Sequence, residues 1–146
     1  MKSRQKITRV QLETGTSSDF TLFGLVSAEP DYKLSLSINK VLKISLRNDN
    51  PVIITGEKKQ SLHFSRFSFN SGKHEISYHL ISNKSGKDFL LSKLKKIDYL
   101  FQVISTDSEP DGSLFTAPLR SIDSITAVFP FDPSEIKDKN LQYLIP

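Results

Sequence analysis

Cysteine is absent from this 146-residue chain, and long apolar runs are absent as well. Without cysteine there are no disulfide bonds, zinc–thiolate sites, iron–sulfur clusters or cysteine nucleophiles. No segment approaches the roughly 20 apolar residues that a membrane helix needs. The basic start, residues 1–6, is not followed by an apolar stretch of signal-peptide length. We therefore expect a cytoplasmic protein that does not contact a membrane.

An excess of positive charge is missing beyond the first nine residues. The formal net charge is +4, and four residues supply all of it, namely Lys2, Arg4, Lys6 and Arg9. The balanced remainder lacks the broad basic surface of a dedicated nucleic-acid-binding protein. We interpret residues 1–17 as a polar, basic lead-in and residues 18–146 as one domain. Residues 1–5 are expected to be dispensable for folding, because they have almost nothing to bury.

The sequence does contain regularly spaced apolar residues that predict helices and strands. Leu34, Ile38, Val41 and Leu42 share one face of a helix that begins near Pro30. Apolar stretches and two-residue alternation predict strands at residues 6–12, 19–26, 44–47, 52–54, 62–69, 75–81, 88–91, 97–104 and 126–131. A second helix is expected from a Thr116 cap to Ile125, and a short one after Asp132.

The connections between the central strands are too short for parallel crossovers. We therefore expect an α+β fold: a single domain with a mainly antiparallel sheet of about six or seven strands, two main helices on one face and a short C-terminal helix. Turns are predicted at residues 48–51, 70–73 and 85–87. Two Ser-Gly-Lys triplets, at 71–73 and 85–87, lack the earlier glycine of a phosphate-binding loop, so we interpret both as hairpin turns.

Several short motifs occur together along the chain. They are Asp19-Phe20 with Leu22 and Gly24-Leu25, Asp31-Tyr32-Lys33-Leu34, Ile38-Asn39, Leu80-Ile81-Ser82-Asn83-Lys84, and residues 127–140 with Asp132-Pro133. In this order they resemble the IPExxxVDY family, found mainly in Bacteroidetes, over residues 19–141. Ile97-Asp98-Tyr99 matches the second half of the naming motif, whereas Ser92 and Lys93 replace its proline and glutamate. The resemblance implies a bacterial cytoplasmic protein and no particular reaction, cofactor or catalytic residue.

The polar residues form no complete catalytic or metal-binding motif. His63, His74 and His79 lack the paired spacing of many metal sites. Residues 107–112 begin like a calcium loop, but Pro118 stands where that loop needs a bidentate glutamate. We therefore predict no catalytic residue, no cofactor and no metal, and we rank enzyme activity behind the two hypotheses given below. Asp98 is expected to point to solvent, because it alternates with apolar positions in its predicted strand.

Aromatic residues on two adjacent predicted strands have two explanations. They are Phe64, Phe67, Phe69 and Tyr78, with Arg66 among them. Either they build the core on the sheet, or they form a platform on which single-stranded bases stack. The glycine-rich aromatic octamer of an RNA-recognition domain is missing, which favours the core.

Tyr32 and Leu36 lie i, i+4 apart, nearly opposite the apolar face of the first predicted helix. With Lys33 and Lys40 beside them, they form a small apolar centre with a polar rim, as interfaces have. Our first hypothesis is a non-enzymatic interaction module that binds a protein partner or forms a homo-oligomer. We expect this face to meet such a partner, a second copy of the chain or the chain's own N-terminal arm. The alternative is a domain that binds a small ligand or a single-stranded nucleic acid on the exposed face of the sheet.

Overall fold

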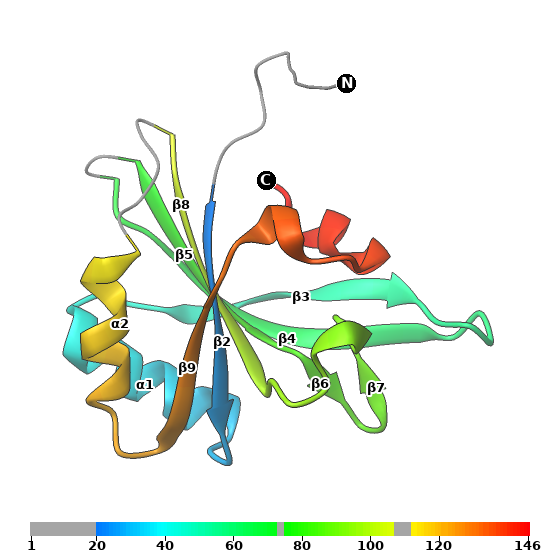
Figure 1. Ribbon diagram of the computed structural model, residues 1–146, viewed down its shortest axis with the longest axis horizontal. Helices are drawn as coiled ribbons and strands as arrows, with labels where there is room; N and C mark the ends of the chain where they lie inside the picture. Colours follow the sequence, from blue (N-terminus) through cyan, green and yellow to red (C-terminus); the bar gives the residue numbers. More distant parts are fainter. Residues whose placement is uncertain (1–19, 73–74, 107–111) are drawn as a thin grey trace.

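A six-stranded antiparallel sheet forms the centre of the computed structural model, which describes residues 20–72, 75–106 and 112–146 (Figure 1). The strand order is β3-β4-β5-β8-β2-β9. The strands are β2 (Phe20–Ser27), β3 (Arg47–Thr55), β4 (Ser61–Asn70), β5 (Ile76–Ser82), β8 (Tyr99–Ser105) and β9 (Ile125–Phe131). A separate two-stranded hairpin consists of β6 (Lys84–Ser85) and β7 (Asp88–Phe89). The predicted α+β domain with a mainly antiparallel sheet is confirmed.

Two α-helices cover one face of the sheet, α1 (Asp31–Leu42) and α2 (Ser113–Arg120). Leu34 and Ile38 of α1 are fully buried and belong to the same core cluster as Phe23, Phe101 and Leu119. Helix α1 ends where Lys43 takes a left-handed conformation, with φ at 57°. Neither α-helix in the described part of the chain is long and apolar enough to cross a bilayer.

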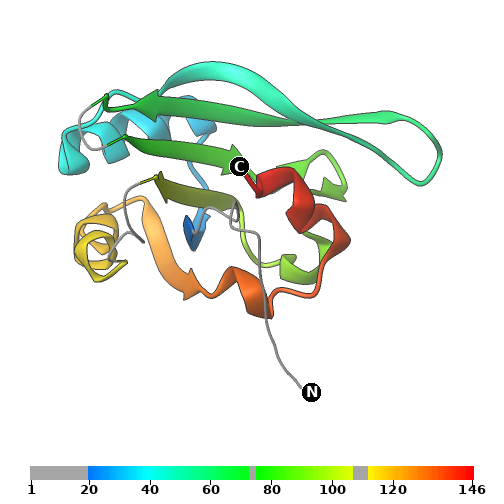
Figure 2. The ribbon, with the colours of Figure 1, turned by 90° about the horizontal axis from the view of Figure 1, so that it is seen from above.

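The opposite face of the sheet, which we expected to be exposed, is covered where a second core cluster lies. Three short 3₁₀-helices lie on this side: η1 (Ser92–Leu94), η2 (Pro133–Glu135) and η3 (Lys139–Leu144). They and the loops around them bury a second core cluster, which includes Phe64, Leu100 and Leu144. Figure 2 shows the α-helices at one side of the curved sheet and the C-terminal segment at the other.

Several predicted boundaries differ from the structure. The predicted turn at residues 48–51 is instead part of β3, which has a register shift between Asp49 and Val52. An edge strand with a bulge tolerates Pro51, because no further strand needs its missing N–H. Thr116 lies inside α2 rather than at its start, and its hydroxyl donates to the Gly112 carbonyl. The predicted strand at residues 6–12, the lead-in, His74 and residues 107–111 lie outside the described residues.

Candidate functional site: a lysine-bordered groove beside β9

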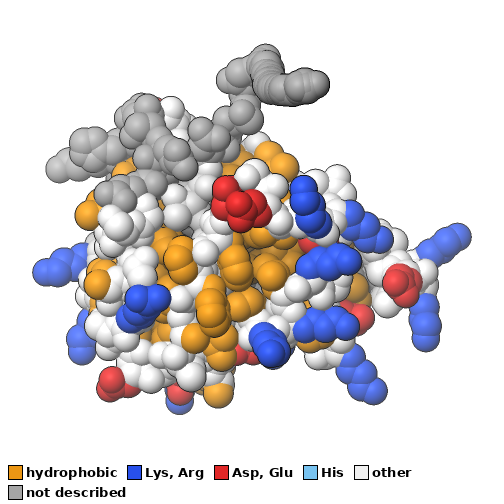
Figure 3. All heavy atoms as spheres, viewed as in Figure 1, with side chains coloured by type: hydrophobic (Ala, Val, Ile, Leu, Met, Phe, Trp, Pro, Cys, Tyr) orange, Lys and Arg blue, Asp and Glu red, His pale blue; other side chains and the backbone are white. Residues whose placement is uncertain are grey.

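A groove of about 440 Å³ lies between η1 and the edge strand β9. We call it the β9 groove, and its lining consists of Ser92, Lys93, Leu94, Lys95, Lys96, Ile97, Phe129 and Phe131. The rings of Phe129 and Phe131 stack with their centroids 6.5 Å apart and their planes at 21°. Phe129 is 46% exposed, which is unusual for so large an apolar side chain on a strand. Figure 3 shows apolar side chains gathered on this face, with Lys and Arg around them and most of these on the right.

Gly24 of β2 makes room for the floor of the β9 groove. A Cβ atom at this position would lie 2.8 Å from Cδ1 of Ile97, and closer still to the ring of Phe131. Real Cβ atoms do not approach other carbon atoms so closely, so any larger residue would push these two side chains outward. The glycine therefore lets Ile97 and Phe131 pack closely against β2.

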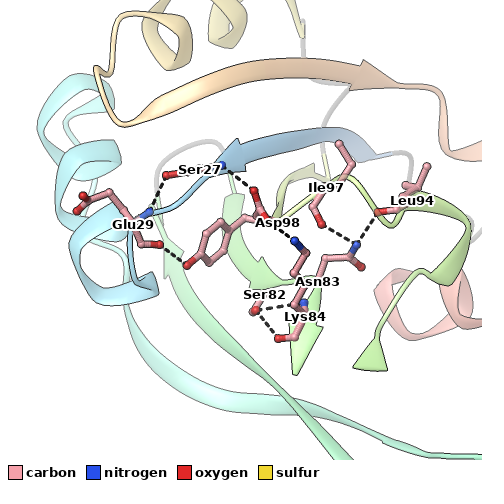
Figure 4. A network of polar contacts seen from close by, with 9 residues as sticks. Ser27, Glu29, Ser82, Asn83, Lys84, Leu94, Ile97 and Asp98 are labelled. Atoms are coloured by element: carbon pink, nitrogen blue, oxygen red, sulfur yellow. Dashed lines mark hydrogen bonds and ion pairs between the residues drawn. The ribbon is translucent and has the colours of Figure 1, made fainter. Parts of the chain in front are cut away.

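Asn83 holds the η1 side of the groove from behind (Figure 4). Its side chain is completely buried, and its Nδ2 donates to the carbonyls of Leu94 and Ile97, both at 2.9 Å. Its Oδ1 accepts from the Leu91 N–H at 2.8 Å. Both N–H donors and the oxygen of the Asn83 amide are thus bonded to the backbone of the loop that forms the groove.

A second anchor comes from the C-terminal segment. Oδ2 of Asp138 accepts from the Lys93 N–H at 3.1 Å, and Nδ2 of Asn140 donates to the Leu90 carbonyl at 2.8 Å. The backbone that carries the lysines is therefore fixed at both ends by side chains distant in sequence. Such a fixed backbone reduces the ordering cost of binding.

The ammonium groups of the groove's lysines form no ion pair with another described residue. The ion pairs within that part of the chain are Arg66 with Asp49 and Lys84 with Asp98. Lys93, Lys95 and Lys96 are exposed on one side of the groove. Acidic side chains lie above the apolar patch in Figure 3. Asp132 and Glu135 are exposed at η2, which follows β9 directly. The charge around the groove is therefore asymmetric.

Asp98 does not point freely to solvent, so the prediction for this residue is wrong. Its Oδ2 accepts from the Ser27 N–H at 2.9 Å, and its Oδ1 lies 2.5 Å from Nζ of Lys84 (Figure 4). The strand begins one residue later, at Tyr99, so strand alternation does not set the direction of this side chain. Asp98 therefore links the end of β2 to the start of β8 through this hydrogen bond, and its role is structural.

Tyr99 completes the same polar network. Its hydroxyl donates to the Glu29 carbonyl at 2.6 Å, just before α1 begins. Burial, followed by the nearby carboxylates of Asp31, Asp98 and Glu29, raises the pKa of Tyr99 to about 12. The phenol therefore stays protonated as a donor throughout the physiological range, which suits a tether between the sheet and α1.

A separate polar pocket of about 320 Å³ lies at the β3 edge of the sheet. Oγ of Ser68 lies 2.7 Å from Nδ1 of His79, its cross-strand partner, and Asp49 lies beside Ser68. Burial and the positive charge of Arg66 lower the pKa of His79, so its ring is neutral at pH 7. Hydrogen bonds from the Asn50 N–H and the Ser68 hydroxyl lower the pKa of Asp49.

The residues named from sequence are distributed over several regions. Tyr32 and Leu36 are 55% and 64% exposed, and Lys33 and Lys40 are exposed on the same helix. The aromatic platform is not formed: Phe64 belongs to one core cluster, and Phe67, Phe69 and Tyr78 belong to the other. No group of three or more metal-binding side chains occurs among the residues that the structure describes.

No protein-family model matches the chain, and no curated protein matches it. The resemblance to the IPExxxVDY family therefore stays an expectation. The structure does show where the two departures from the naming motif lie. Ser92 and Lys93 both line the β9 groove.

Sequence reasoning did not find this groove. The available signals were the cluster of three lysines at residues 93–96 and the two phenylalanines flanking Pro130. Their contact joins segments more than 30 residues apart along the chain, and spacing within one element cannot predict such a contact.

Proposed function

We propose that this chain is a non-enzymatic binding module that docks a segment of a partner protein in the β9 groove. The half-exposed ring of Phe129 beside a backbone fixed by Asn83 and Asp138 carries the proposal. An exposed aromatic side chain in a concave site is typical of the anchor points of interfaces. The fixed backbone means that little order has to be gained on binding.

The lining of the groove supports binding rather than catalysis. Among the described residues no carboxylate and no imidazole lines it, so these residues supply no pair of groups there for general acid–base chemistry. The Ser92 hydroxyl lies 3.5 Å from Oδ2 of Asp138, and no imidazole belongs to the described lining that could serve as its base. The bacterial and cytoplasmic character implied by the family resemblance belongs to this same proposal.

A second binding surface is the outer face of α1, around Tyr32 and Leu36. Two large side chains more than half exposed on one helix support a role in self-association. This surface and the β9 groove lie on different elements, so each can be tested without altering the other.

Panning a displayed library of short random peptides against the purified protein tests the proposed function. We expect enriched peptides to bind the parent and the Ile53→Ser variant, and to lose binding to Phe129→Ser. Ile53 is a matched control, because it is an apolar residue on the other edge strand and is 52% exposed, close to the 46% of Phe129.

Circular dichroism and thermal unfolding of each variant confirm that the fold is retained. Failure to enrich any peptide would overturn the proposed function. So would enriched peptides that bind Phe129→Ser as tightly as the parent.

A further inference from the structure

We infer that the segment bound in the β9 groove is acidic on one side of an apolar anchor, and that it docks through its side chains without adding a strand to β9. The inference rests on the proposed function and specifies the partner's chemistry. It follows from three features of the groove: its positive charge, the uneven distribution of charge around it, and the few main-chain hydrogen-bonding groups that the open edge of β9 offers to a further strand.

Charge complementarity defines the first requirement. Lys93, Lys95 and Lys96 line the groove, and none of their ammonium groups forms an ion pair with another described residue. No carboxylate belongs to the part of the lining that the structure describes. Like charges held close together repel one another, and an acidic ligand relieves that repulsion. A basic segment is repelled instead, and this argues against the chain's own lead-in, which carries four basic residues and one acidic residue, Glu13.

The asymmetry of charge distinguishes a peptide from a nucleic acid. The lysines lie on the η1 side of the groove, where the Asp138 carboxylate is engaged by the Lys93 N–H, whereas Asp132 and Glu135 are exposed at η2, directly after β9. A nucleic-acid strand carries one negative charge per nucleotide and would meet these carboxylates as it left the groove. A peptide can place its acidic residues toward η1 and neutral residues toward η2. The local arrangement therefore favours a protein segment.

The open edge of β9 is poorly suited to strand addition. Pro130 has no N–H to offer to a further strand, and the Val128 carbonyl accepts a hydrogen bond from Nη2 of Arg120 at 3.5 Å. An added strand depends mainly on such main-chain hydrogen bonds for its affinity. The partner segment therefore docks through its apolar anchor on Phe129 and Phe131 and through its carboxylates on the lysines.

The test uses three short fluorescent peptides that share a central Phe-Leu pair. The flanking residues on one side are Asp and Glu, Ser and Gly, or Lys and Arg. We expect the acidic peptide to bind about 10-fold more tightly than the neutral one at low ionic strength. This preference should shrink at about 0.15 M salt, because exposed charges are screened there.

Matched double variants locate the charge effect. Lys95→Ser with Lys96→Ser should abolish the preference for the acidic peptide but leave neutral-peptide binding within about twofold of the parent. Lys58→Ser with Lys87→Ser removes the same charge from exposed turns elsewhere and should preserve the preference. Equal loss in both double variants would show an effect of net charge alone and would overturn the inference.

Other outcomes separate the inference from the proposed function. If no peptide binds, the proposed function fails. If neutral and basic peptides bind as tightly as the acidic one, only the inference fails. Tighter binding of an oligothymidylate than of the acidic peptide would replace the protein partner with nucleic acid. Tighter binding of a second copy, seen as dimers that the acidic peptide does not dissociate, would also overturn the inference.

Backbone methylation tests the mode of docking. Two versions of the acidic peptide carry N-methyl groups on alternate residues, one set even and the other odd. We expect both versions to bind within about threefold of each other, because side-chain docking does not depend on one row of N–H groups. Loss of binding by one version alone would show strand addition.

Discussion

The buried amide of Asn83 shows how a single side chain can organise a loop. Its side chain satisfies one N–H and two carbonyl groups between Leu91 and Ile97. Asn83→Ala would leave these buried backbone groups without partners, and we expect it to lower the free energy of unfolding by about 2–4 kcal/mol.

Urea unfolding of Asn83→Ala and of a control, Asn48→Ala, measures the effect. Asn48 is exposed on β3, so its replacement should change stability by less than about 0.5 kcal/mol. Equal stability of the two variants would contradict the role given to Asn83.

Gly24 is a second single residue on which the candidate site depends, because two side chains that line the groove pack against it. Gly24→Ala should destabilise the protein by about 1–3 kcal/mol, because the new methyl group would overlap the side chains of Ile97 and Phe131. It should also displace Phe131 and weaken peptide binding in the groove. Adding Ile97→Val removes the overlapping Cδ1 atom and should recover part of the stability. A double variant no more stable than Gly24→Ala would argue against this packing account.

These two residues also show what sequence alone can reveal at this scale. Asn83 and Gly24 both fall within the motifs that resemble the IPExxxVDY family, but nothing in their spacing indicates what they contact. Asn83 acts on a loop that follows it, and Gly24 accommodates a side chain more than 100 residues away. Contacts of this kind depend on the assembled sheet and are invisible to local patterns.

At the scale of elements, the β4–β5 ladder carries a pH-sensitive group. The pKa of His79 in the folded protein is below the ordinary value of about 6.5, chiefly because burial disfavours the charged ring. Its neighbours are Arg66 and Ser68 on β4, Asp49 on β3 and its cross-strand partner Gln102 on β8. As the pH falls, the unfolded chain therefore binds a proton before the folded protein does.

Stability should accordingly be full above pH 6.5 and should decrease as the pH falls from about 6.5 toward the lowered pKa. Replacing the histidine removes this dependence, so His79→Gln should flatten the slope of stability against pH in that window. Denaturant unfolding at a series of pH values, with His63→Gln as a control on the exposed side of β4, provides the measurement. An unchanged slope in His79→Gln would show that another group is responsible.

The elements themselves were predicted well where one periodicity dominates. The spacing of Leu34 and Ile38 predicted α1, and the structure has it at Asp31–Leu42. The prediction failed at β3, where Asn, Asp and Pro indicated a turn but the chain continues through a bulge. Turn-forming residues fit an edge strand, because only one side of it must pair. Whether a strand lies at the edge of the sheet depends on the whole fold, and local composition cannot predict it.

For the whole molecule, short connections and alternating apolar residues predicted the fold class. They did not predict the second core cluster. Leu90, Leu91 and Leu144 come from loops and short helices with no regular period, and they cover the sheet face opposite α1 and α2. The β9 groove exists because this covering layer ends beside the last strand. Its chemistry therefore depends on how loops from two parts of the chain meet the sheet edge.

The outer face of α1 provides a prediction about the state of the whole molecule in solution. Leu36 is 64% exposed, so Leu36→Glu removes apolar surface without opening the core. If this face mediates self-association, the variant should become a monomer while its helix content stays unchanged, because a charge in an apolar interface is costly. Light scattering gives the mass, and circular dichroism gives the helix content.

The control for this prediction is Ile53→Glu, which places the same charge at a residue of similar exposure on β3. It should keep the mass of the parent. A parent protein that is already monomeric, or a Leu36→Glu variant with the parent's mass, would leave the α1 face with no part in self-association. The β9 groove would not be affected by that result, because Phe129 and the lysines beside it belong to other elements.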